Sequence, residues 1–210
     1  MRTKLKICGI TNFYDAQMAV GLGVHWLGFN FYEKSPRYIQ PGEAARIIAN
    51  LKHQVETVAV LVRPSRKDIE TVLSQCQVDR LQIYEAVDVD DFSVFGLPVI
   101  DCYRLNPNEP LVINSNGAEM LLLDSYSEKV LGGSGKTFDW NQIPAEVPRD
   151  KLVLAGGITP ENIAEALATV RPAVIDVASG VESSPGIKDA HKIKKLISEI
   201  HKFNGKRSEK

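Results

Sequence analysis

The sequence contains few cysteines, few histidines and no long apolar run. Its three cysteines, Cys8, Cys76 and Cys102, are odd in number and far apart, so we expect reduced thiols and no disulfide framework. The four histidines show no spacing typical of metal ligands, which argues against a metal site. No segment approaches the ~18 consecutive apolar residues of a transmembrane helix, so the sequence predicts no membrane span.

An excess of charge of one sign is also missing. The chain has 25 Lys and Arg against 26 Asp and Glu, a formal charge of −1. Electrostatics therefore gives no reason to expect nucleic acid or an anionic membrane as a partner. The charged N-terminus has no apolar signal-peptide core behind it, which predicts a cytoplasmic protein. We expect residues 204–210 to form a disordered basic tail.

Short β-rich runs alternate with helical stretches along the whole chain. Several runs are continuously apolar, as parallel strands covered on both faces are. Eight such units in 210 residues leave about 26 residues each, near the lower size limit of a (β/α)8 barrel. The expected strands are Lys4–Cys8, Trp26–Phe31, Thr57–Val62, Arg80–Ile83, Pro98–Cys102, Met120–Asp124, Leu152–Ala155 and Val174–Ala178.

An open doubly wound sheet is the alternative, but it usually carries a glycine fingerprint after its first strand. Cys8-Gly9-Ile10-Thr11 is not such a fingerprint, and no linker divides the chain. We therefore predict an α/β protein with a single (β/α)8 TIM barrel over residues 1–210. The connections over 86–95 and 106–117, around strands 4 to 6, should be short or irregular. A later helix is expected to begin with Thr159 as its N-cap and Pro160 in its first turn.

In a barrel, the C-terminal strand ends and the loops after them form the active site. Cys8 ends the first expected strand and Asp124 the sixth, so a thiol and a carboxyl face one pocket and could divide base and acid roles. Cys8 is useful as a base only if its pKa is lowered. The alternatives are a buried filler for Cys8 and a turn-capping role for Asp124. Arg37 suits bidentate capture of a carboxylate, or else is a solvated surface residue.

Glycines cluster in the last loops. Gly156, Gly157 and Gly180 follow the last two strands, where barrels often bind phosphate on backbone N–H groups. The alternative is that these glycines only form tight turns. Residues 132–137 read Gly-Gly-Ser-Gly-Lys-Thr, but Val130 stands where a P-loop needs its first glycine, so this segment indicates a substrate-covering lid.

Taken together, these segments resemble the phosphoribosylanthranilate isomerase family, and they occur in the family's order and spacing. The matching stretches are Lys6–Thr11, Gly28–Phe31, Ser35–Ile39, Leu122–Ser125, Gly132–Trp140, Ala155–Asn162, Asp176–Glu182 and Pro185–Asp189.

The resemblance implies an Amadori rearrangement of N-(5-phosphoribosyl)anthranilate, with no cofactor, because the proton transfers need only an acid and a base. It assigns the general base to Cys8, the general acid to Asp124 and the grip on the anthranilate carboxylate to Arg37. Gln82 and Asp176 are expected to contact substrate. The resemblance places the phosphate on Gly133, Ser134, Gly135, Gly156, Gly157, Ser179 and Gly180.

The middle of the chain departs from the family. Tyr84 and Glu85 stand where His and Gly are usual, and Asp101 and Cys102 replace Lys and Ala. Arg63 stands where Asn is common, and Ala178 replaces a serine. If Glu85 or Asp101 points inward, binding of an anionic substrate should weaken. Two alternatives therefore stay open, a non-catalytic phosphosugar-binding barrel and an isomerase of a related phosphorylated aminosugar. The chain is expected to be a monomer or a homodimer.

Overall fold

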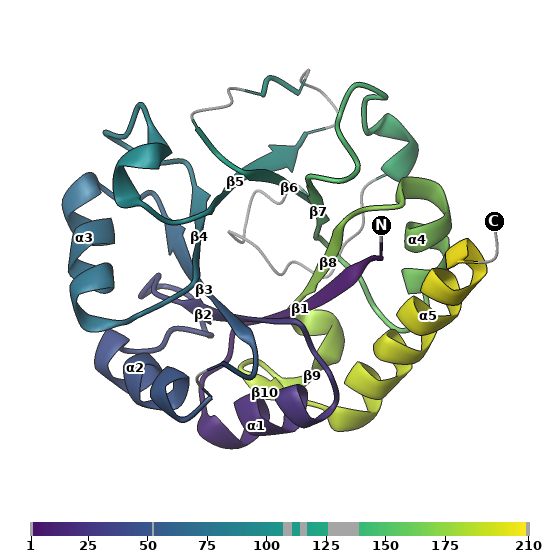
Figure 1. The fold of residues 1–210 in the computed structure, drawn as a ribbon, viewed down its shortest axis with the longest axis horizontal. Helices are drawn as coiled ribbons and strands as arrows, with labels where there is room; N and C mark the ends of the chain where they lie inside the picture. The colour runs from purple at the N-terminus through teal and green to yellow at the C-terminus, as the bar shows by residue number, and fades with distance from the viewer. Residues whose placement is uncertain (1, 52, 107–110, 114–116, 126–138, 209–210) are drawn as a thin grey trace.

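The computed structural model describes residues 2–51, 53–106, 111–113, 117–125 and 139–208. Eight parallel strands form a closed barrel in which each strand pairs with the next and β1 pairs with β8 (Figure 1). The predicted fold class is confirmed, with strand boundaries that differ from the expected ones by at most three residues. The strands are β1 (Lys4–Cys8), β2 (Trp26–Asn30), β3 (Glu56–Val62), β4 (Arg80–Tyr84), β5 (Val99–Leu105), β6 (Met120–Ser125), β7 (Leu152–Leu154) and β8 (Val174–Val177).

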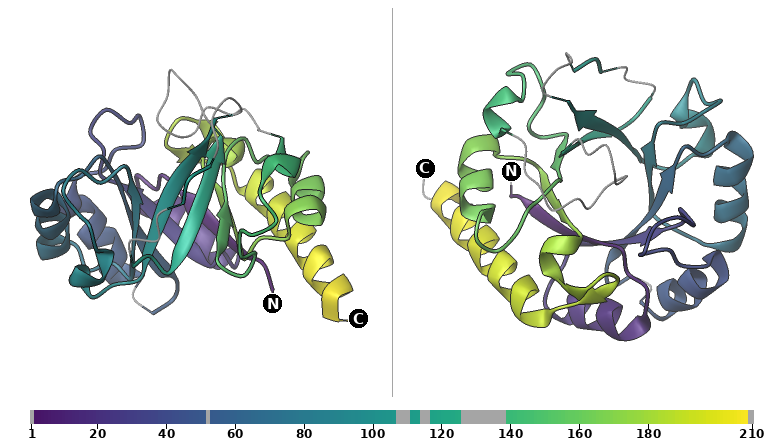
Figure 2. Two further views of the ribbon diagram at one scale, coloured as in Figure 1. Left: turned by 90° about the horizontal axis from the view of Figure 1, so that it is seen from above. Right: turned by 180° about the vertical axis from the view of Figure 1, so that it is seen from behind.

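Helices surround the barrel on the outside (Figures 1 and 2). The α-helices are α1 (Phe13–Gly21), α2 (Pro41–Asn50), α3 (Arg66–Gln75), α4 (Ile163–Val170) and α5 (Ala190–Ser208). Single 3-10 turns η1 (Phe92–Phe95), η2 (Trp140–Gln142) and η3 (Ser179–Val181) follow β4, β6 and β8, and a small hairpin of β9 (Glu182–Ser184) and β10 (Ile187–Lys188) precedes α5. The described part of the β5–β6 connection contains no helix, which confirms the irregular connection expected around strands 4 to 6.

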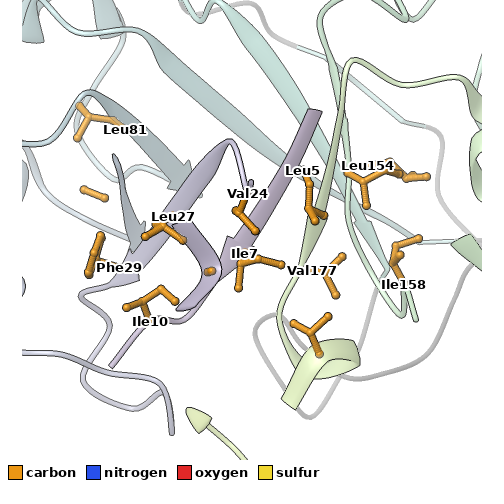
Figure 3. Close-up of a cluster of buried hydrophobic side chains, with 14 of the residues drawn as sticks. Leu5, Ile7, Ile10, Val24, Leu27, Phe29, Leu81, Leu154, Ile158 and Val177 are labelled. Carbon is orange, nitrogen blue, oxygen red and sulfur yellow. The ribbon is translucent and has the colours of Figure 1, made fainter. Parts of the chain in front are cut away.

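Alternation along the strands separates two apolar layers. On β1, Leu5 and Ile7 point outward into the layer between barrel and helices, which Figure 3 shows in part. Lys6 and Cys8 point inward, toward the interior layer that contains Val60 and Leu122. Because side chains alternate with period two, the outward residues hold the helices and leave the inward ones at the strand ends for chemistry.

Two local elements differ from the prediction. Helix α5 continues to Ser208, so the described residues 204–208 are helical, where the sequence predicts a disordered basic tail over 204–210. The Asn204 side chain accepts a hydrogen bond from Thr3 N at 2.9 Å and donates one to Thr3 O at 3.0 Å, which ties this part of the helix to β1. Helix α4 begins at Ile163 with Asn162 as its N-cap, and not after Thr159. The Asn162 side chain instead accepts from Thr159 N and donates to Gly157 O, which holds 157–162 as a loop.

Candidate active site

The described residues that the sequence singles out for function lie around one cavity at the C-terminal ends of the strands. This site cavity is lined by Cys8, Asn30, Ser35, Arg37, Val60, Val62, Gln82, Tyr84, Asp124, Ala155, Gly156, Gly157, Ile158, Asp176, Val177, Ala178, Ser179 and Gly180. Its volume is about 70 Å³, below the roughly 300 Å³ at which ligand pockets usually begin. The predicted Gly133, Ser134 and Gly135 lie outside the described residues.

A larger cavity of about 910 Å³ lies elsewhere, between α2 and α3. Its lining includes His25, Glu56 and Asp79, which come from the N-terminal ends of the strands or the loops before them. Conserved chemistry of (β/α)8 barrels lies at the opposite end, so size does not make this cavity the better candidate. The described residues contain no group of His, Cys, Asp and Glu suited to hold a metal ion, and no helix among them is long and apolar enough to cross a bilayer.

Cys8 shares its surroundings with Lys6, two residues earlier on the same strand. A Cβ atom built at Gly28 on β2 would lie 2.9 Å from Lys6 Nζ and 3.2 Å from Cys8 Sγ. Ammonium and thiol therefore occupy the space that the missing side chain leaves. Burial raises the pKa of the Cys8 thiol above its ordinary value, while Lys6 and Lys188 act in the opposite direction. Position and cationic neighbours suit a base, but the thiol is the resting form.

Lys6 itself is fully buried and forms an ion pair with Asp176 on β8. The ammonium nitrogen lies 2.9 Å and 3.0 Å from the two carboxylate oxygens of Asp176. Asp176, predicted to contact substrate, is thus engaged by Lys6, although it also lines the site cavity. This ion pair attaches β1 to β8 where the barrel closes and fixes the ammonium beside the thiol.

Asp124 ends β6 and is buried on the inner side of the barrel. Its Oδ1 accepts a hydrogen bond from Ser125 N at 2.7 Å, and its Oδ2 lies 3.3 Å from the Tyr84 hydroxyl. Burial raises the pKa of the Asp124 carboxyl from 3.8 to about 6, and the charge of Asp176 acts in the same direction. A carboxyl that holds its proton close to neutral pH is suited to general acid catalysis.

Arg37 lies in the loop after β2 and is 8% exposed, which excludes the solvated surface alternative. Its Nε and Nη2 donate to the two carboxylate oxygens of Glu182, at 2.9 Å and 2.7 Å. Lys188 Nζ also donates to Glu182, at 2.6 Å, and to the backbone oxygen of Cys8, at 2.6 Å. These bonds use two of the five donors of the guanidinium. The guanidinium lines the site cavity and retains donors for a carboxylate ligand.

The glycine loops after β7 and β8 meet at the edge of the cavity. A Cβ at Gly180 would lie 1.9 Å from the backbone oxygen of Ile158, so only glycine lets the two loops approach this closely. Gly156 and Gly157 both have positive φ, at 84° and 64°. No hydrogen bond among the described residues uses their amide N–H groups. Together with Ser179, these backbones offer donors of the kind that bind phosphate.

The two acidic departures from the family do not enter the cavity. Asp101 lies on the outer face of β5, where it accepts a hydrogen bond from Tyr103 Oη at 2.6 Å. Glu85 forms ion pairs with Arg63, at 2.6 Å, and with Arg104. Glu85 and Arg63 both adopt left-handed backbone, with φ of 52° and 51°, which glycine or asparagine adopts with less strain. The expected weakening of anion binding therefore loses its structural basis.

Sequence reasoning missed Lys6, Glu182 and Lys188 as parts of the site. Lys6 could have been found, because the period-two pattern that places Cys8 inside the barrel places Lys6 there as well. Glu182 and Lys188 lie within the matching stretches, but only the fold brings them to Arg37, which is 145 residues from Glu182 in the sequence.

Comparisons with known proteins agree with this geometry. The family model for N-(5'phosphoribosyl)anthranilate (PRA) isomerase matches residues 5–199. The curated N-(5'-phosphoribosyl)anthranilate isomerase of Citrifermentans bemidjiense is 41% identical over 202 residues, covering 96% of this chain and 98% of that protein.

Solved structures give the same similarity. Monomers of the dimeric phosphoribosylanthranilate isomerase from Thermotoga maritima match with a TM-score of 0.78 and 36% identity, over 95% of this chain and 99% of that one. A phosphoribosylanthranilate isomerase in complex with reduced 1-(o-carboxyphenylamino)-1-deoxyribulose 5-phosphate matches with a TM-score of 0.75 and 34% identity, over the same shares of the two chains.

Proposed function

This chain belongs to the N-(5'-phosphoribosyl)anthranilate isomerase family, and from that premise we propose that Cys8 is its general base and Asp124 its general acid. The chain converts N-(5-phosphoribosyl)anthranilate to 1-(2-carboxyphenylamino)-1-deoxyribulose 5-phosphate, a step of L-tryptophan biosynthesis. The observation that supports the two roles is their placement, a thiol and a raised-pKa carboxyl on the lining of one cavity.

The reaction requires one proton transfer by each of the two groups, followed by a tautomerisation. Asp124 donates its proton to the furanose ring oxygen, the bond from C1 to that oxygen breaks, and an open-chain Schiff base forms. Cys8 as thiolate then removes the proton from C2, and the electron pair of that bond forms the C1–C2 double bond of an enolamine. Movement of the C2 hydroxyl proton and protonation at C1 give the ketone. No step changes the overall oxidation state of the substrate, and each is driven by a proton transfer, so an acid and a base suffice.

The pKa shifts define how the two groups share a proton. Asp124 titrates at about 6, and the thiol of Cys8 above its ordinary value of 9.0. Between these values the pair holds one proton, which resides mostly on the thiol, and the reactive form with a protonated Asp124 and a Cys8 thiolate is a minor tautomer. The fraction of that form is constant between the two pKa values, so kcat/KM should rise up to pH about 6, then stay level, and fall only at a pH above the ordinary thiol pKa of 9.0.

Arg37 and the glycine loops complete the proposed substrate site. The free donors of Arg37 would hold the anthranilate carboxylate, while Gln82 would contact the sugar. The backbone amides of Gly156, Gly157, Ser179 and Gly180 would hold the phosphate.

Two further proposals concern the location and the assembly of the enzyme. The three free cysteines fit an enzyme that works in the cytoplasm. The relatives fit an enzyme that is a monomer or a homodimer.

An isotope experiment tests the two roles separately. Substrate deuterated at ribose C2 is compared with unlabelled substrate, using wild type, Cys8→Ser and Asp124→Asn. A weaker base makes cleavage of the C2 bond rate-limiting, so the isotope effect on kcat should increase in Cys8→Ser. A missing acid makes ring opening rate-limiting, so the effect should fall toward one in Asp124→Asn. A smaller isotope effect in Cys8→Ser and a larger one in Asp124→Asn would contradict the assigned roles of base and acid.

A further inference from the structure

Tyr84 ends β4 and lines the site cavity. The side chain is 8% exposed, and its hydroxyl oxygen lies 3.3 Å from Asp124 Oδ2 and 3.4 Å from Gln82 Nε2. An amide can only donate through its nitrogen, so Gln82 donates to the phenol and the phenol can donate to the carboxylate. The three side chains therefore form a short chain of hydrogen bonds that ends on the proposed acid.

The two oxygens of Asp124 are not equivalent in this arrangement. Oδ1 accepts a short hydrogen bond from Ser125 N, at 2.7 Å, which a protonated oxygen would oppose. The carboxyl proton consequently resides on Oδ2, the oxygen that faces Tyr84. When Asp124 is protonated, the phenol oxygen can accept from it, and when Asp124 is ionised, the phenol can rotate its own hydrogen toward Oδ2 and donate.

We propose that Tyr84 is a positioning residue for the rearrangement. Its hydroxyl orients Asp124 Oδ2 toward the ring oxygen of the substrate, and it donates a hydrogen bond to Oδ2 once Asp124 has given up its proton. The proposal rests on the proposed role of Asp124 as the acid.

The proposal separates two consequences of losing the hydroxyl. Tyr84→Phe keeps the ring and removes the hydroxyl, together with its contacts to Asp124 Oδ2 and to Gln82 Nε2. Because the bond to Oδ2 stabilises the carboxylate, its loss should raise the pKa of Asp124 further. A higher pKa alone would put more Asp124 in its protonated, reactive form and would speed the reaction. A fall in kcat therefore indicates that Asp124 is no longer correctly oriented. A shift of the acid limb of the pH profile indicates that the hydrogen bond to Asp124 is lost.

The chain supplies a matched control on β5. Tyr103 Oη donates to Asp101 Oδ2 at 2.6 Å on the outer face of the barrel, away from the site cavity. Tyr103→Phe removes the same kind of hydroxyl–carboxylate contact without touching Asp124. The other titratable groups that face Tyr84 or Asp124 are Cys8, Cys102 and Asp176, and they are unchanged in both variants.

The experiment measures kcat, KM and their pH profiles for wild type, Tyr84→Phe, Tyr84→His and Tyr103→Phe. For Tyr84→Phe we expect kcat to fall roughly 10-fold, the size of one lost hydrogen bond to a charged group, with KM nearly unchanged. The acid limb should move above pH 6, and Tyr84→His, which restores a donor, should recover part of both effects. Tyr103→Phe should behave as wild type.

Two outcomes would overturn the proposal. Tyr84→Phe with wild-type kcat and an unmoved acid limb would make Tyr84 a space-filling residue, and a change confined to KM would make it a substrate contact. The variant Asp124→Asn, alone and combined with Tyr84→Phe, separates this failure from failure of the proposed function. Wild-type turnover by Asp124→Asn would refute the assignment of Asp124 as the general acid. An inactive Asp124→Asn together with a wild-type-like Tyr84→Phe would refute only the role proposed for Tyr84.

Discussion

Arg37 donates to both carboxylate oxygens of Glu182, from Nε at 2.9 Å and from Nη2 at 2.7 Å. The pair is almost completely buried, and Lys188 connects the same carboxylate to the backbone oxygen of Cys8. The loop after β2, the hairpin after β8 and the end of β1 are thereby joined. The guanidinium therefore has a fixed orientation before any ligand binds. Because Lys188 also contacts the backbone of Cys8, the guanidinium is held at a fixed position relative to the proposed base.

Glu182→Gln should weaken substrate binding and destabilise the fold. The substitution removes the negative charge between two buried cations, which typically costs about 3–5 kcal/mol of unfolding free energy. Arg37 would lose its bidentate partner, so we expect KM for the substrate to rise roughly 10-fold with a smaller change in kcat. Denaturant unfolding and steady-state kinetics measure the two effects. An unchanged or lower KM would show that Glu182 blocks the carboxylate subsite and does not support it.

Gly28→Ala should disturb the contact between Lys6 and Cys8, because the new methyl group also comes within 3.2 Å of the Cα atom of Cys8. The new methyl group would lie 2.9 Å from Lys6 Nζ and 3.2 Å from Cys8 Sγ, so the ammonium or the thiol has to move. Displacements of this size in an active site lower kcat/KM by up to about 100-fold. Gly42→Ala in α2, where a Cβ meets nothing within 4 Å, is the matched control and should keep full activity. Wild-type kinetics for Gly28→Ala would mean that the position of the ammonium has no influence on the thiol.

The fold and most of the cavity lining could be predicted from the sequence, because apolar strand runs alternate with helical stretches and the C-terminal ends of barrel strands lie on one face. Alternation along β1, β4, β6 and β8 puts Cys8, Gln82, Asp124 and Asp176 inside the barrel, and closure brings their strand ends together. Nothing in that argument depends on distant side chains.

The partners of these residues could not be predicted in the same way. The contact between Arg37 and Glu182 depends on how two loops fold over the barrel, and that between Tyr84 and Asp124 on a pair of rotamers. The orientation of Glu85 was unpredictable for a different reason. Its backbone is left-handed, with φ of 52°, and its side chain forms ion pairs with Arg63 and Arg104 and does not line the cavity. The residue type alone predicts neither this conformation nor these partners.

Asp124→Asn should make the protein more stable at neutral pH. Folding raises the pKa of this carboxyl from 3.8 to about 6, so the native state binds more protons than the unfolded state between these values. Stability contributed by the bound proton is present below pH 4 and lost as the pH rises through 6. At pH 7.5 the native state therefore contains a buried carboxylate that costs about 1–3 kcal/mol. An isosteric amide removes that cost, at the expense of activity.

Chemical denaturation at pH 7.5 and at pH 4 measures this effect, with the exposed Asp150→Asn as control. The unfolding free energy of Asp124→Asn should exceed that of wild type at pH 7.5 and match it at pH 4. An equal gain at both pH values, or a loss at pH 7.5, would contradict the raised pKa. The control should leave stability nearly unchanged at both.

The most direct test of the account is turnover of N-(5-phosphoribosyl)anthranilate by Cys8→Ser and Asp124→Asn beside wild type, Cys76→Ala and Asp150→Asn. Loss of substrate fluorescence, coupled to indole-glycerol-phosphate synthase, follows the reaction. Both site variants should fold, bind a product analogue, and lose about 100- to 10,000-fold in kcat, as groups that transfer protons in the transition state do. The two controls should remain within a few-fold of wild type. Turnover close to wild type in a folded Cys8→Ser or Asp124→Asn variant would contradict the acid–base assignment on which the mechanism rests.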